Sequence, residues 1–244
     1  MNIHLYLENQ KKNLIHEFKN NMSTCLIATP YENINRHTSQ YNWKISYLQH
    51  IKPTSAIIIQ KPFMLPELWV GRTYTRYRHA FIEYLKQYYQ YTDKLPGTLQ
   101  VDHLQSTYRF KKDHPQYFIR LYLIERTINT SYGAGFEKSF YKNERNTIPK
   151  GGIHMDWITF LKVYGVKLPS KQLSPDEWSS WTWLLALELD KNGIEDALIS
   201  YHGISTVLNL GYRGKYTPLP ISLKFKNEIL NHPLINLYPS LVDR

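Results

Sequence analysis

Residues 117–124, YFIRLYLI, have strong β character, because β-branched and aromatic residues dominate the stretch. Before it, the turn signal LPG at residues 95–97 leads into a second strand-like run at residues 98–101. After it, the two glycines of SYGAGF, residues 131–136, let the backbone turn sharply at a helix start. This order predicts two strands that flank a polar loop, with a helix behind them.

Two further segments have helical signals. Residues 73–91 carry an aromatic and apolar stripe at helical spacing, with basic residues beside it. The stripe consists of Tyr77, Phe81, Leu85 and Tyr88. Ser174 can cap a helix that begins at Pro175, and Glu177 completes a capping box. We therefore expect helices over residues 73–91 and 175–191.

The remaining segments give shorter elements. Residues 1–50 lack a sustained period and predict short helices and loops. SAIIIQ, residues 55–60, is β-branched and bounded by prolines, which predicts a buried strand. Residues 155–163 and 194–202 predict short helices, and Gly203 is expected to end the second one.

Together these elements predict an α+β fold, in which a mainly helical body surrounds a small β-hairpin-plus-helix centre. A chain of 244 residues suits one main domain with an appended lobe. We expect a mixed, largely helical region at residues 1–72. A basic helix and the hairpin centre follow at residues 73–150, and a helical lobe at residues 151–244.

The charge balance points to an acidic partner. Thirty Lys and Arg against twenty Asp and Glu give a formal net charge of +10 and a pI near 9.4. Such a field attracts polyanions and speeds their encounter with the protein. Nucleic acid is the leading partner and an acidic membrane surface the second, while a basic protein with no polyanionic partner remains an alternative.

The cysteine content and the start of the chain bear on the compartment. A single cysteine, Cys25, excludes an internal disulfide framework and a Cys-based zinc ribbon. The first residues lack the apolar core of a secretory signal, and no stretch has the length of a membrane helix. We expect a cytoplasmic protein without membrane insertion, although export by a dedicated secretion machine would be compatible with this composition.

An acid and a histidine stand side by side where the first strand runs into the loop. Asp102 can bind a cation there, while His103 remains free as a base. A neutral imidazole suits that task, because the unperturbed pKa of histidine is about 6.5. Asn129 lies in the basic helix entry beyond the second strand.

In this arrangement the sequence resembles the HNH, or ββα-metal, endonuclease superfamily over roughly residues 98–140. The resemblance implies that Asp102 and Asn129 bind a divalent metal ion, Mg²⁺ or alternatively Mn²⁺. It implies that His103 is the general base that activates water. The metal would bind a phosphate oxygen and neutralise charge on the leaving oxygen.

Other acids and histidines are candidates of lower rank. Glu137 either joins the metal ligands or pairs with a neighbouring base. His154 and Asp156 form a second ligand pair if the glycine break before them folds this segment back over the site. We expect structural roles for His79 and His202, on a helix face and at a helix end. Cys25 lacks a protease signature.

Basic side chains around the hairpin are expected to bind phosphates. They are Arg76, Arg78, Arg109, Lys111, Lys112, Arg126 and Lys138. The first hypothesis is thus a metal-dependent endonuclease that cleaves phosphodiester bonds, with DNA favoured over RNA. A toxin or effector, a defence component and a mobile-element enzyme are equally compatible settings.

Two alternatives come from other classes of protein. A non-catalytic nucleic-acid-binding protein would grip phosphates and stack bases with the tyrosine-rich helix and residues 109–126. An inhibitor or adaptor would bind a protein partner through an apolar patch on the tryptophan-rich helix at residues 176–191. The first would need neither metal nor His103, and the second would be indifferent to nucleic acid.

Overall fold

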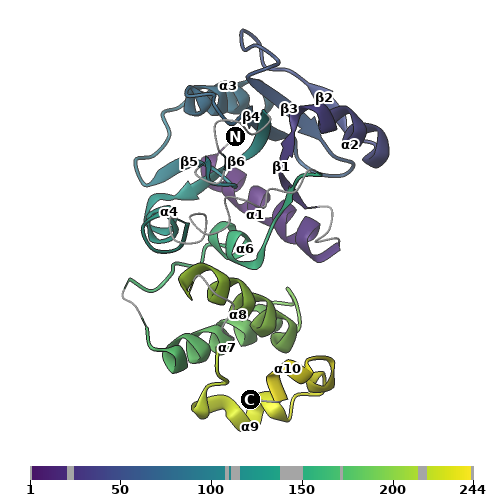
Figure 1. The fold of residues 1–244 in the computed structure, drawn as a ribbon. Helices are drawn as coiled ribbons and strands as arrows, with labels where there is room; N and C mark the ends of the chain where they lie inside the picture. Colours follow the sequence, from purple (N-terminus) through teal and green to yellow (C-terminus); the bar gives the residue numbers. More distant parts are fainter. Residues whose placement is uncertain are drawn as a thin grey trace.

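An antiparallel sheet with its covering helices forms one part of the molecule, and a group of helices forms the other (Figure 1). The computed structural model describes residues 2–20, 25–107, 110, 116–137, 151–170, 173–213 and 219–242. The strands are β1 (Leu26–Pro30), β2 (Lys44–Ser46), β3 (Ala56–Gln60), β4 (Glu67–Gly71), β5 (Leu99–His103), β6 (Tyr117–Glu125) and β7 (Ile153–His154). The α-helices are α1 (Ile3–Asn20), α2 (Ile34–Tyr41), α3 (Tyr77–Tyr89), α4 (Arg126–Tyr132), α6 (Trp157–Tyr164), α7 (Pro175–Lys191), α8 (Ala197–Arg213), α9 (Lys226–Leu230) and α10 (Pro239–Val242). A π-helical turn, η4 (Gly133–Glu137), continues α4, and short 3-10 turns are η2 (Tyr31–Asn33), η5 (Leu223–Phe225) and η6 (Ile235–Leu237).

Strand β6 lies at the centre of the sheet, whose order is β2-β3-β4-β6-β1-β7 with β5 also on β6. In the first half of β6, Ile119 lies opposite Val70 of β4 and Ala28 of β1. In the second half, Leu123 lies opposite Val101 of β5. All these pairings are antiparallel, so β6 has partners along its whole length, and all its residues except the last are buried.

The predicted centre of the fold is wrong. Strands β5 and β6 pair and α4 follows them, but the described residues show no separate ββα-metal-like unit inside a helical body. Instead β6 belongs to a curled half-barrel sheet, in a structure that is about 51% helix and 17% strand. In its first half β6 has β1 on one edge and β4 on the other, as a strand inside a larger sheet does and a strand of an isolated hairpin does not. The fold remains α+β overall.

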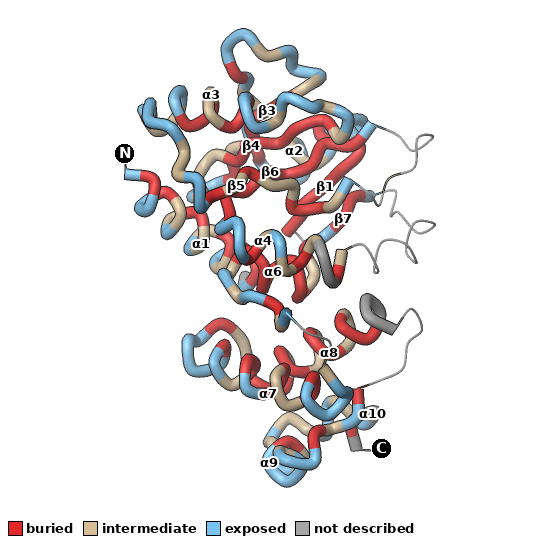
Figure 2. The backbone as a smooth tube through the Cα atoms, turned by 90° about the vertical axis from the view of Figure 1, so that its left-hand side faces the viewer, coloured by how far each residue is buried: buried red, intermediate tan, exposed pale blue. Residues whose placement is uncertain are grey.

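Short helices and loops were predicted for residues 1–50, but residues 3–20 form one long helix, and strands β1 and β2 with the short helix α2 follow it. The side of α1 that faces the sheet is buried and the outer side is exposed (Figure 2). Tyr6 packs in the core beside α3, whereas Leu14 and Phe18 pack in the core beside α6. Gln10 and Glu17 are also buried and interrupt the apolar stripe, which hides the helical period in the sequence.

Three locally encoded elements are confirmed. Strand β3 falls within the predicted strand at residues 55–60, and α3 within the predicted helix at residues 73–91. Helix α7 has the predicted bounds. Its capping box is complete, because Glu177 N donates to Ser174 Oγ at 3.3 Å and Ser174 N donates to Glu177 Oε2 at 2.7 Å.

The predicted helix stop at Gly203 is wrong, because α8 continues through it to Arg213. A Cβ atom at Gly203 would lie 2.1 Å from Nε1 of Trp157 in α6. This glycine therefore permits a close approach of two helices and does not end one. His202 accordingly lies inside α8, next to the ring of Tyr238.

The C-terminal lobe has its own apolar cluster. Trp183 of α7 is fully buried there with Tyr201, Ile229 and Leu241. Trp178 is buried as well, so these two tryptophans stabilise the core and do not contribute to an exposed patch. None of the helices in the described part of the chain is long and apolar enough to cross a membrane.

Candidate functional site

Strand β5 directs Asp102 and His103 to opposite faces of the sheet. Asp102 Oδ2 accepts a hydrogen bond from Lys162 Nζ of α6, whereas the His103 ring lies 4.3 Å from the ring of Tyr77 of α3. The pairing of β5 with β6 extends through His103, so the usual alternation of a strand holds for both residues. The structure therefore does not bring the two side chains to one site.

Two carboxylates converge on one buried ammonium on the Asp102 face of the sheet. Lys162 Nζ lies 2.6 Å from Asp102 Oδ2 and 2.7 Å from Glu137 Oε1. The Lys162 side chain is 2% exposed, while those of Asp102 and Glu137 are 23% and 20% exposed. The cluster thus has one buried ammonium and two carboxylates that solvent reaches. We call Asp102, Glu137 and Lys162 the open centre.

The pKa shifts in the open centre follow from burial and from the ion pairs. Burial lowers the pKa of Lys162, but the carboxylates of Asp102 and Glu137 outweigh it, and the net shift is upward. Burial raises the pKa of Glu137, and Lys162 opposes only part of that effect. Lys162 therefore remains an ammonium at neutral pH, and Glu137 binds a proton more readily than an ordinary glutamate does.

Asn129 lies on the same face as the open centre, but its amide is already bonded. Its Nδ2 donates to Gln100 Oε1 at 3.1 Å, and Gln100 alternates with Asp102 on that face of β5. The segment formed by α4 and η4 thus carries both Asn129 and Glu137 towards this face. Of the three residues predicted to act together, the structure brings Asp102 and Asn129 to one face and leaves His103 on the other.

His103 is buried against α3. Burial lowers its pKa to about 4, although the charge of Asp102 raises it in part. Its Nε2 is buried and makes no hydrogen bond to the residues that the structure describes. The ring is therefore neutral at physiological pH and packs against Tyr77.

The predicted phosphate-binding residues divide into two groups. Arg76, Arg78 and Arg126 are exposed, the first two at the start of α3 and the third at the start of α4. The guanidinium of Arg78 lies 5.2 Å from the ring centre of Tyr77. The other four predictions, Arg109, Lys111, Lys112 and Lys138, lie outside the described residues.

The second predicted ligand pair is divided between two roles. Asp156 caps α6, because its Oδ1 accepts from Thr159 N at 2.7 Å, and its charge also raises the pKa of Glu137. His154 is exposed on the edge strand β7. Burial lowers its pKa, and His37 lowers it further. Cys25 is a buried free cysteine, and burial raises the pKa of its thiol.

A second charge cluster lies wholly inside the molecule, between α1 and the sheet. Arg120 of β6 contacts Glu17 Oε2 at 2.7 Å and Glu67 Oε1 at 2.9 Å. Lys61 pairs with Glu17 and lies 3.2 Å from Glu67 Oε1. All four side chains are buried. We call these residues the closed network.

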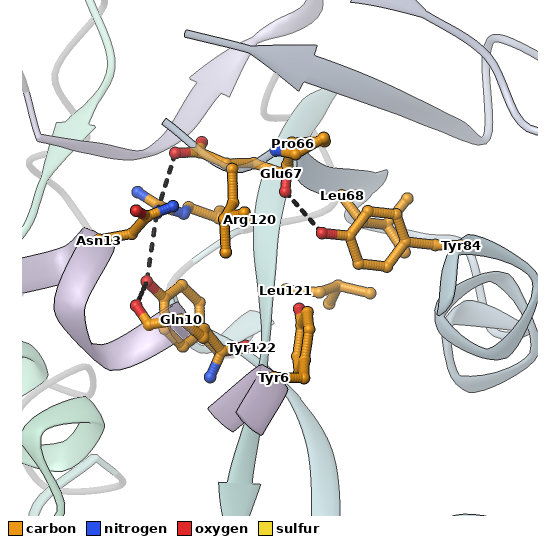
Figure 3. Close-up of a pocket in the computed structure, with 11 residues that line it drawn as sticks. Tyr6, Gln10, Asn13, Pro66, Glu67, Leu68, Tyr84, Arg120, Leu121 and Tyr122 are labelled. Carbon is orange, nitrogen blue, oxygen red and sulfur yellow. Dashed lines mark hydrogen bonds and ion pairs between the residues drawn. The ribbon is translucent and has the colours of Figure 1, made fainter. Parts of the chain in front are cut away.

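A small cavity adjoins the closed network (Figure 3). Arg120 donates to the Tyr122 hydroxyl at 3.2 Å, and that hydroxyl donates to Gln10 O at 3.4 Å. Gln10 also bonds both backbone groups of Leu123 and so completes the edge of β6. The cavity encloses about 20 Å³, which is room for about one water molecule. A macromolecular substrate cannot reach these charges.

Lys162 is the residue of the open centre that the sequence did not indicate. It lies in WITFLKVY, the otherwise largely apolar sequence of α6, and its side chain is almost fully buried. A lone lysine among buried residues is the signal that was available, because a buried ammonium requires anionic partners. The identity of those partners depends on long-range packing, which the sequence pattern does not specify.

Comparisons with protein-family models, with curated proteins and with solved structures find no match to this chain. Within the described ranges, no three His, Cys, Asp or Glu side chains are grouped to hold a metal ion. The open centre offers two carboxylates, the ligand type that Mg²⁺ prefers, and few protein ligands suit an ion that keeps several waters. Both carboxylates reach solvent, so a divalent ion there would share them with the ammonium of Lys162.

Proposed function

We propose that this chain is a metal-dependent nuclease whose reactive groups are Asp102, Glu137 and Lys162. The observation that supports this proposal is the convergence of two partly exposed carboxylates, from β5 and η4, on one buried ammonium. A net charge of +10 favours a polyanionic substrate. We favour DNA over RNA as that substrate, as in the hypothesis from the sequence.

The chemistry follows from the charges of the open centre. Asp102 and Glu137 would hold the ion, which supplies charge neutralisation at the phosphate and a more acidic bound water. Lys162 keeps its proton, so it acts as a fixed positive charge and not as a base. Such a charge stabilises the negative charge that develops on the phosphoryl oxygens. His103 has no part in this arrangement, because it lies on the opposite face of β5.

The test is cleavage of plasmid DNA and of total RNA by the purified chain with Mg²⁺, Mn²⁺ or EDTA. Asp102→Asn and Glu137→Gln remove one charge each and keep the side-chain shape. We expect each to lower the cleavage rate by about 10²-fold or more. His103→Gln is the matched control on the other face of β5, and it should cleave at the rate of the unchanged chain.

Circular dichroism and thermal melting establish that each variant is folded. Cleavage that survives in Asp102→Asn, or that is lost in folded His103→Gln alone, would contradict the assignment of the open centre. Salt-sensitive binding without cleavage under any metal would instead support the non-catalytic nucleic-acid-binding protein.

A further inference from the structure

A groove is lined by residues of α4 and of the stretch that follows α6. It encloses about 540 Å³, within the range of about 300–1,000 Å³ that is usual for small-ligand sites. The lining residues that matter are Arg126, Thr127, Thr130, Lys167, Leu168 and Pro169. The groove is thus large enough for a small ligand and is lined by both charged and apolar groups.

Hydrogen bonds fix the two walls of the groove relative to each other. Ser131 Oγ of α4 accepts from Leu168 N at 3.2 Å and donates to Ile128 O at 2.7 Å. The hydroxyl of the next residue, Tyr132, donates to Val166 O at 2.8 Å. The groove therefore exists before a ligand arrives, which lowers the ordering cost of binding.

Two cations at this groove have no ion-pair partner among the residues that the structure describes. Arg126 and Lys167 are exposed, and neither forms an ion pair with any residue that the structure describes. Thr127 and Thr130 are exposed as well and place hydroxyl groups on the same helix as Arg126. Pro169 is half-buried and supplies an apolar group, whereas the side chain of Leu168 is buried in the core. A ligand that matches these groups is anionic at one end and apolar at the other.

We infer that the groove binds one nucleotide unit of a single-stranded nucleic acid, with its phosphate on Arg126 and Lys167 and its base against Pro169. This inference rests on the proposed function, because the same α4 and η4 segment carries Glu137 of the open centre. The volume of the groove is sufficient for one nucleotide unit. The groove is then a subsite that holds the strand beside the reactive groups.

Fluorescence anisotropy with a labelled oligothymidylate tests the inference, in EDTA so that no strand is cut. We expect Arg126→Ala/Lys167→Ala to weaken binding at least 10-fold. The slope of log affinity against log salt should also fall in magnitude by about 0.7 for each lost phosphate contact. The matched control is Arg36→Ala/Lys226→Ala, which removes the same charge from exposed positions elsewhere and should change affinity less than 3-fold.

Equal weakening by the two double variants would overturn the site, since it would show an effect of net charge alone. Equal loss of single-strand and duplex binding in Arg126→Ala/Lys167→Ala would overturn the single-strand assignment. The cleavage assay tests the proposed function separately from these two binding results. If Asp102→Asn still cleaves but Arg126→Ala/Lys167→Ala binds weakly, the result supports the binding site in the groove. It contradicts the proposed reactive role of the open centre.

Discussion

The closed network and the open centre are both built from lysine or arginine with two carboxylates, yet they differ in access and in charge. The closed network joins Glu17 and Glu67 to Lys61 and Arg120, so its formal charges cancel, and all four side chains are buried. The open centre has two carboxylates for one ammonium, and both carboxylates reach solvent.

This difference separates a structural role from a chemical one. In the closed network, burial raises the pKa of Glu17, but Arg120 and Lys61 outweigh it and the net shift is downward. Every carboxylate there has a cation, and the network ties α1 to β4 and β6. The open centre has an excess of negative charge that a further cation could neutralise. Buried charges that cancel indicate a structural core. An excess of negative charge that solvent can reach indicates a binding site.

The largest expected effect comes from breaking the closed network. Arg120→Met leaves Glu17 and Glu67 buried with only Lys61 between them. Removing one partner of a buried ion pair costs about 3–5 kcal/mol, so the free energy of unfolding should fall by that amount. Urea denaturation followed by circular dichroism measures it. A loss below about 1 kcal/mol would show that the network does not anchor α1.

The next effect concerns His103, the buried titratable group on the other face of β5. Its folded pKa of about 4 lies below the ordinary 6.5, so between these values the unfolded chain binds a proton that the folded chain excludes. The free energy of unfolding should therefore decrease as pH falls from 6.5 to 4, by on the order of 3 kcal/mol at most. His103→Gln cannot titrate and should lose less stability over this range.

Denaturation of both proteins at several pH values in EDTA checks this prediction. Other carboxylates also destabilise both proteins in acid, so the informative quantity is the difference between the two curves. Parallel curves would show that His103 is not held neutral by burial.

A third effect distinguishes the two charge clusters by metal binding. If the open centre binds Mg²⁺ or Mn²⁺, ion at a hundred times its dissociation constant should add about 2.7 kcal/mol to the free energy of unfolding. Asp102→Asn should abolish this gain. Glu17→Gln lowers the stability of the closed network but should keep the gain in full. Thermal melting with and without the ion measures both, and a gain that survives in Asp102→Asn would place the ion elsewhere.

Local signals predicted the elements whose causes lie within a few residues. The capping box of α7 needs only Ser174 and Glu177, and the β character of residues 117–124 is a property of that stretch itself. The position of β6 inside a curled sheet could not be predicted, because β1 and β4 lie far earlier in the chain. Helix α1 was missed because Gln10 and Glu17 interrupt its apolar stripe.

The candidate site was predictable only in part. The motif drew attention to Asp102, which lies in the open centre, but it was expected to act with His103 at the end of a strand. Pairing continues past that point, since Leu104 N donates to Arg120 O at 3.0 Å, and this keeps the two side chains on opposite faces. Lys162 comes from a helix sixty residues away along the chain, so no local pattern could join it to Asp102.

The smallest expected change in stability comes from Lys162→Met, although the same change should abolish cleavage. Lys162 is as deeply buried as Arg120, but its carboxylate partners reach water and can be solvated when it is removed. We therefore expect a loss of about 1–2 kcal/mol, well below that of Arg120→Met. Urea denaturation and plasmid cleavage are measured on the same preparations. If the free energy of unfolding fell as much as in Arg120→Met, the open centre would be a second structural network. Such a result would mean that water does not solvate its carboxylates when the ammonium is removed. Full cleavage by a stable Lys162→Met protein would remove the ammonium from the reaction and leave the carboxylates alone as the reactive groups.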